Sequence, residues 1–212
     1  SEGGAIEAIN VPMLISIYST FIKNHATVYG GSVIVKLSNR LVIAYCTFVQ
    51  NDAYINGGVL TILHLKEMTT MNCVISKNYA SNSGGVLYSL STNKVVLQRL
   101  NCTKNIAGST GGGVITMTGI EFVQVKVCSF HNNSAKSSGA VIIISNSQTI
   151  EIGLCKFHSN TALFHAGAMM AENVKNIIIS KSKFEQHQSG QNGGILYLSS
   201  VNLTQIYACQ VL

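Results

Sequence analysis

The sequence has no tryptophan, a single proline (Pro12) and few charged side chains, which make up 10% of its 212 residues. Ordinary soluble domains carry roughly a quarter of charged residues, so Ser, Thr, Asn, Gln and backbone groups must cover most of this surface. The hydrophobic fraction of 47% can supply the core of one large domain and argues against a disordered chain. This composition favours an all-β protein.

Long apolar runs and basic clusters are also absent. No stretch of 18 or more apolar residues occurs, so no transmembrane helix is predicted. The formal charge is +6, but the 14 Lys and Arg residues are scattered along the chain and form no run. We therefore do not expect nucleic acid as a partner.

A targeting segment is missing from the first residues. Positions 1–20 lack the basic start and the compact apolar centre of a signal peptide. The segment SEGG at the start falls on a repeat boundary, and Leu212 falls inside a repeat. We expect an excerpt or a processed form of a longer protein, with neither end capped.

Glycine is frequent, with 19 residues, and it is regularly placed. A pair of small residues followed by two mostly apolar residues recurs as GGAI, GGSV, GGVL and similar segments, at intervals of 27, 27, 27, 28, 26, 28 and 27 residues. Such a constant period indicates a repeat architecture. The segments begin at Gly3, Gly30, Gly57, Gly84, Gly112, Ser138, Ala166 and Gly193.

A second motif follows 18 or 19 residues after each start. It is an apolar residue with Asn three positions later, and Ala follows the Asn by two in the first six repeats. The seventh repeat keeps Phe184 but has His187 where Asn is expected. The asparagines are Asn24, Asn51, Asn78, Asn105, Asn133 and Asn160.

The apolar runs between these motifs predict strands. They are three to five residues long, rich in Val and Ile, and bounded by Gly, Asn and Ser. A 27-residue unit with about three such runs matches one triangular coil. We therefore predict a right-handed parallel β-helix over 1–212, a single solenoid of seven full coils and a partial eighth.

Stacked coils explain why residue types recur in columns. Successive coils lie about 4.8 Å apart, so each repeat position forms a ladder of like residues along the axis. The small pair allows a tight corner or a positive φ, where a Cβ would clash. The Asn column predicts a turn whose stacked amides hydrogen-bond from coil to coil, a structural role that also uses the tolerance of Asn for left-handed conformations.

These motifs resemble a known pattern. GGAI at 3–6 and Phe-x-x-Asn at 21–24, 48–51, 130–133 and 157–160 are similar to the repeats of chlamydial polymorphic outer membrane proteins. Related Cys-x-Phe-x-x-Asn and Gly-Gly repeats occur in β-helical surface proteins of ciliates, which resemble the pectin-lyase-like fold. The resemblance covers essentially the whole chain and implies a secreted or cell-surface stalk with an adhesive role.

Five cysteines share one column, two residues before the Phe position, and their parity predicts that they point inward. They are either buried thiols acting as small hydrophobic side chains, or disulfides joining Cys46 to Cys73 and Cys128 to Cys155. We favour thiols, because parallel Cβ vectors hold the Cβ atoms slightly beyond the usual ~3.5 to 4.5 Å. The column contains Cys46, Cys73, Cys128, Cys155 and Cys209.

One outward column has metal-ligating residue types. His131 and His158 each follow the Phe of their coil, and Glu185 takes that place in the next coil. Two histidines and a carboxylate can hold a metal ion, but a chance alignment on a solvated surface is the simpler interpretation. We predict no cofactor.

Three observations concern possible ligands and catalysis. The only aspartate is Asp52 and the seven glutamates fall at different coil positions, so no acidic catalytic cluster is predicted. A partial lysine column precedes the Asn positions, with Lys23, Lys77 and Lys104. It could engage an anionic polymer or a lipid, or could be a solvated edge. The sequons for N-glycosylation are at Asn101, Asn132 and Asn202.

We therefore expect a non-catalytic structural or adhesive protein, extracellular or on the cell surface. Its predicted partners are further coils or other copies of itself, in filaments or lateral arrays, because open solenoid ends expose strand edges and core. The alternative is a carbohydrate-binding or carbohydrate-active β-helix, whose face would accommodate a glycan.

Overall fold

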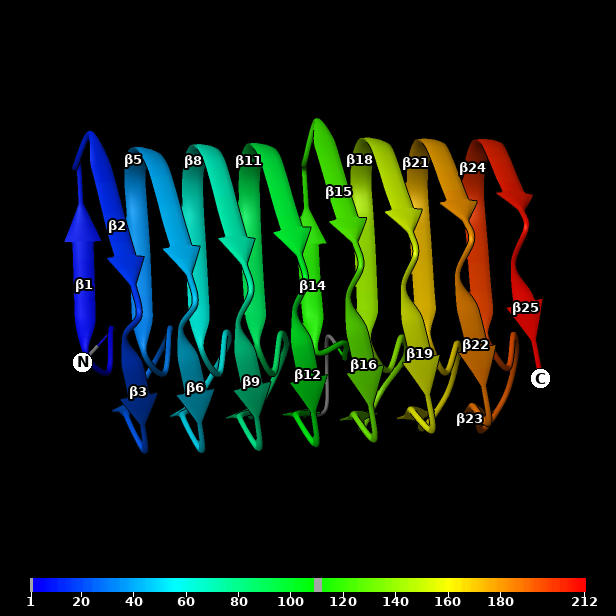
Figure 1. Ribbon diagram of the computed structural model, residues 1–212, viewed down its shortest axis with the longest axis horizontal. Coiled ribbons are helices and arrows are strands. Elements are labelled where there is room, and N and C mark those ends of the chain that lie inside the picture. Colours follow the sequence, from blue (N-terminus) through cyan, green and yellow to red (C-terminus); the bar gives the residue numbers. More distant parts are fainter. Residues whose placement is uncertain (1, 109–111) are drawn as a thin grey trace.

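The computed structural model describes residues 2–108 and 112–212, and it is a parallel β-solenoid of about eight coils (Figure 1). The described residues contain no helix. The chain rises along one side of each coil, bends at the top, descends along the near side and returns at the bottom, so the winding is right-handed (Figure 1). The predicted fold is confirmed.

Three parallel sheets run along the solenoid axis. Sheet A contains β1 (Ile6–Ile9), β2 (Met13–Ile17), β5 (Val33–Ala44), β8 (Leu60–Met71), β11 (Leu87–Gln98), β14 (Ile115–Thr118), β15 (Phe122–Lys126), β18 (Ile142–Gly153), β21 (Met169–Ser180) and β24 (Leu196–Tyr207). Sheet B contains β3 (Thr20–Ile22), β6 (Thr47–Val49), β9 (Val74–Ser76), β12 (Asn101–Thr103), β16 (Ser129–His131), β19 (Lys156–His158), β22 (Lys183–Glu185) and β25 (Gln210–Val211). Sheet C contains β4 (His25–Ala26), β7 (Asp52–Ala53), β10 (Tyr79–Ala80), β13 (Ile106–Ala107), β17 (Ser134–Ala135), β20 (Thr161–Ala162) and β23 (Gln188–Ser189).

Four corners with a left-handed residue shape each of the second to seventh coils. In the second coil these residues are Gly30, Leu37, Tyr45 and Gln50, with φ between 49° and 63°. We number the corners in that order: corner 1 precedes sheet A, corner 2 bends its long strands, corner 3 separates sheets A and B, and corner 4 separates sheets B and C. The left-handed conformation costs an L-residue about 1–2 kcal/mol. Contacts between coils must therefore stabilise the bends.

The corner predicted at Ser138 is wrong by one residue. Ile142 pairs with Ile115 on one side and with Met169 on the other, so the corner lies at Gly139 and the neighbouring intervals are both 27. Gly139 has a φ of +61°, and a Cβ there would lie 2.4 Å from Cγ1 of Ile143. The positive φ and this close approach favour glycine one position after Ser138.

The core is a continuous column of inward side chains. Phe48, Phe130 and Phe157 are fully buried, and Phe130 stacks on Phe157 with ring centroids 5.0 Å apart. Burying each such side chain contributes roughly 1.5–3 kcal/mol. The rows of Val, Ile and Leu in sheet A complete this core.

Candidate functional site

The residue after the left-handed position at corners 2, 3 and 4 points inward and often carries a polar side chain. Its heteroatom accepts the backbone N–H of the matching residue one coil earlier. Thus Val11 N–H donates to Ser38 Oγ at 3.1 Å, and Cys155 N–H donates to Ser182 Oγ at 3.1 Å. The bend directs these N–H groups away from carbonyl partners, and a buried donor must find an acceptor.

Corner 4 has the most regular of these ladders. The backbone N–H and Nδ2 of each Asn donate to Oδ1 of the next Asn at 2.8–3.1 Å, over five successive steps. The second Nδ2 hydrogen goes to a carbonyl in the preceding coil, as from Asn51 to Phe21 at 3.0 Å. The ladder consists of Asn24, Asn51, Asn78, Asn105, Asn133 and Asn160.

The left-handed conformation belongs to the residue before each ladder asparagine. Lys23, Gln50 and Lys77 have φ of 54°, 55° and 57°, whereas the asparagines that follow have ordinary φ. The sequence-based explanation through the left-handed tolerance of Asn was therefore wrong. Asn occupies this column because its amide both accepts and donates in the direction of stacking.

His187 occupies the seventh position of this ladder and does not continue it. Both its ring nitrogens are buried and have no hydrogen-bond partner among the residues that the structure describes. Burial lowers the pKa of His187, and the nearby His158 acts in the same direction. The Asn160 side chain accepts from Asn133 and donates to the Phe130 carbonyl, so His187 marks the end of the amide chain.

The cysteine column lies at corner 3, and all six cysteines are free thiols. Cys46 N–H donates to Cys73 Sγ at 3.4 Å, while the Cys73 thiol donates to the Met71 carbonyl at 3.2 Å. Burial raises the pKa of Cys73 to about 11, so its reactive thiolate form is suppressed. Cys102 lies in the phenylalanine column instead, where burial raises its pKa strongly. The column members are Cys46, Cys73, Cys128, Cys155 and the partly exposed Cys209.

The outward column proposed as a weak metal candidate is in register but is not arranged to bind an ion. His158 Nδ1 lies 3.7 Å from Glu185 Oε2, yet Lys183 Nζ lies only 2.6 Å from the other carboxylate oxygen. The hydrogen bond from Lys183 lowers the pKa of the Glu185 carboxyl. In the two described ranges, no three His, Cys, Asp or Glu side chains are placed to hold a metal ion.

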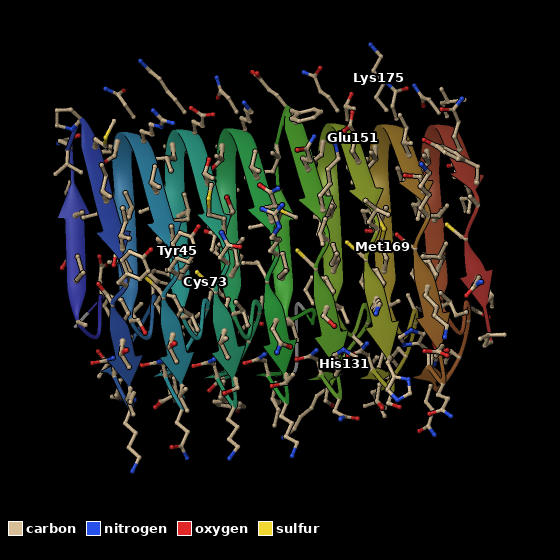
Figure 2. The ribbon with its side chains drawn as sticks, viewed as in Figure 1. Tyr45, Cys73, His131, Glu151, Met169 and Lys175 are labelled. Carbon is tan, nitrogen blue, oxygen red and sulfur yellow. The ribbon has the colours of Figure 1, made fainter. Side chains whose placement is uncertain are left out.

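His131 lies on the outer face of sheet B (Figure 2). It lines a shallow hollow there. Its Nε2 lies 2.5 Å from Ser129 Oγ. Burial lowers the pKa of His131, and the nearby His158 and Lys156 lower it further, which favours the neutral ring near pH 7. The hollow has a volume of about 640 Å³ and is lined by Arg99, Leu100, Asn101, Thr103, Val127, Ser129, His131 and Asn132.

The three sequon asparagines are all exposed. Asn101 faces outward from β12, Asn132 is the left-handed residue of corner 4, and Asn202 lies just past corner 2 in β24. Asn101 and Asn132 line the hollow. Modification of these sites stays a prediction.

Comparisons with family models, curated proteins and solved structures return no match to this chain. The resemblance to chlamydial and ciliate repeats therefore stays a prediction. The part of the chain that the structure describes has no helix suited to crossing a membrane.

Sequence reasoning did not identify the hollow. Arg99 and His131 are 32 positions apart and belong to different repeat positions, so only the stacking of β12 on β16 joins them. The sequence offered one clue to the hollow. Asn101 and Ser129 occupy the same outward position of sheet B in neighbouring coils.

Proposed function

We propose that this protein is a non-catalytic structural solenoid of an extracellular or cell-surface layer, which assembles by association of its coils. The observation that carries the proposal is the Asn ladder of corner 4, which recurs in six consecutive coils and is buried over most of its length. The side chains that recur most regularly in the sequence thus form hydrogen bonds between neighbouring coils.

The carboxylates support a non-catalytic role. Glu67 lies between Arg40 and Lys94, at 3.6 and 3.1 Å, and Glu151 contacts Lys126 at 3.5 Å. Catalysis by paired carboxylates needs one of them protonated or both directed at a substrate. Glu67 and Glu151 lie on separate coils and each contacts a cation, an arrangement better suited to stabilising the surface.

Two surfaces could support association. In the last coil, Ile206 pairs with the buried Ile179 and so faces inward, yet it is 50% exposed. In the first coil, Ile15 and Ile17 face outward from sheet A and are 53% and 47% exposed. A further coil, of this chain or of another copy, would bury Ile206 as Ile179 is buried, and the outward isoleucines favour packing side by side.

Self-association can be tested by analytical ultracentrifugation and electron microscopy over a range of concentrations. We expect concentration-dependent assemblies with coils perpendicular to their long axis. Ile206→Lys should block axial growth, whereas Gln205→Lys, one residue away and outward, should not. Ile15→Lys should remove only lateral pairing. A wild-type chain that stays monomeric at every concentration would rule out the assembly.

The location and the adhesive role need separate measurements. Surface biotinylation of intact source cells should label the protein, and its detection only after lysis would contradict the surface location. Adhesion is tested by binding of the purified protein to those cells.

A reducing-sugar assay on acidic and neutral polysaccharides should show no turnover, and measurable cleavage would favour the carbohydrate-active alternative.

A further inference from the structure

The net charge of the protein is concentrated on one side of the solenoid. We define the sheet B face as the outward residues of sheet B together with the left-handed residues of corners 3 and 4 at its two edges. This face contains seven basic residues and one acidic residue, Glu185. The basic residues are Lys23, Lys77, Arg99, Lys104, Lys156, Lys181 and Lys183.

The remaining faces are neutral, because they contain seven basic and seven acidic residues. The whole formal charge of +6 therefore lies on the sheet B face. Elsewhere, cations are often held by carboxylates, as in the Arg40–Glu67–Lys94 row of sheet A. On the sheet B face, Lys183 alone has such a partner among the described residues.

The basic side chains are spread along the axis. Arg99 and Lys104 belong to the fourth coil, Lys156 to the sixth, and Lys181 to the seventh. With coils about 4.8 Å apart, this set extends over roughly 15 Å. The hollow lined by Arg99 and His131 lies within the same stretch. An extended ligand fits this spacing better than a single small anion.

We infer that the sheet B face binds a linear acidic polysaccharide, one that carries carboxylate or sulfate groups along its length. Arg99, Lys104 and Lys156 supply the positive charges. Between them, Asn101, Thr103 and Ser129 present the amide and hydroxyl groups that sugar hydroxyls bind. The inference is independent of the proposed self-association, because the face runs along the side of the stack.

A nucleic acid is a poorer fit to this surface. Proteins that bind single strands combine a basic groove with aromatic side chains on which bases stack. From the fourth to the seventh coil, the sheet B face has no Phe, Tyr or Trp. The two tyrosines of this face, Tyr18 and Tyr45, stack on each other in the first two coils, away from Arg99 and Lys156.

The test measures binding of the 212-residue chain to heparin and to polygalacturonate, with dextran as the neutral control and a single-stranded oligonucleotide as the competing polyanion. The face variant is Arg99→Asn, Lys104→Gln and Lys156→Gln, and each new side chain already occupies that column at Asn72, Gln50 or Gln210. The control variant is Lys66→Gln, Lys136→Gln and Lys175→Gln, which removes the same charge from other faces. Lys175 projects from the end of the coils where the long strands of sheet A bend, away from the sheet B face (Figure 2).

We expect the face variant to bind an acidic polysaccharide at least about tenfold more weakly. The plot of log affinity against log salt should become shallower, with the magnitude of its slope reduced by about three. The control variant should change affinity less than about twofold. Equal weakening by both variants would show attraction by net charge alone and overturn the inference. Tighter binding of the oligonucleotide, equal binding of dextran, or no binding of either acidic polysaccharide would overturn it as well.

Discussion

Oδ1 of Asn78 accepts two hydrogen bonds from Asn51, one from its backbone N–H at 2.9 Å and one from its Nδ2 at 3.0 Å. Asn78 in turn donates to Asn105 in the same two ways. One side chain thus connects three coils, and each amide oxygen satisfies a backbone donor that the bend at corner 4 would otherwise leave buried and unpaired.

Asn78→Ala should lower the free energy of unfolding by about 3 kcal/mol, because it leaves buried groups of Asn51 and Phe48 without partners. The control is Asn93→Ala at an exposed position of β11, which should change stability by less than about 0.5 kcal/mol. Denaturant unfolding followed by circular dichroism measures both variants. Equal losses of unfolding free energy in the two variants would show that the ladder does not stabilise the fold.

Thiol titration distinguishes buried thiols from disulfides. In the native protein Cys209, which is partly exposed, should react with a thiol reagent at pH 8, while Cys73 should not, because burial raises its pKa to about 11. In denaturant without reductant all six cysteines should react. Fewer than six would show that a disulfide forms, and peptide mapping would then test the Cys46–Cys73 and Cys128–Cys155 pairs.

Acid should destabilise the protein through His187 and His131. Both have a folded-state pKa below the ordinary value of 6.5, so the unfolded chain binds protons first as the pH falls. The stability is therefore fully present above about pH 6.5 and is lost progressively as the pH falls through the lower folded pKa values. Denaturation midpoints measured from pH 8 to pH 4 should show this decline.

His187→Asn should extend the ladder and reduce that acid sensitivity. We expect a gain of about 1 kcal/mol at pH 7, since the Asn amide can accept from the Asn160 backbone N–H. His64→Asn, at an exposed corner 2 position, is the matched control and should give no gain. A His187→Asn variant with wild-type stability at every pH would show that His187 is already satisfied.

Gly84→Ala should destabilise the protein by more than about 2 kcal/mol. Gly84 has a φ of +64°, and an added Cβ would lie 2.4 Å from the Leu87 carbonyl oxygen. Gly153→Ala is the control, because its Cβ would come no closer than 3.3 Å to Ser180 Oγ. The two thermal midpoints, measured side by side, should differ clearly, and equal midpoints would contradict the strain at corner 1.

The repeat columns were predictable because stacking turns a sequence period into a spatial ladder. The Gly-Gly segments and the Phe-x-x-Asn motif indicated coils of 27 residues, and the structure has that spacing. The exception is Ser138, where composition favoured a small pair one residue too early. Strand pairing between Ile115 and Ile142 sets the corner at Gly139.

The sequence by itself determined the solenoid, its period and its buried columns, since each of these depends on which residue type recurs every 27 positions. Only the tertiary structure decided which residue at each bend is left-handed, that Lys183 contacts the Glu185 carboxylate, and that the whole net charge lies on the sheet B face. These depend on backbone bends and on distances between columns, and a scattered row such as Arg99, Lys104 and Lys156 becomes one surface only when the coils stack.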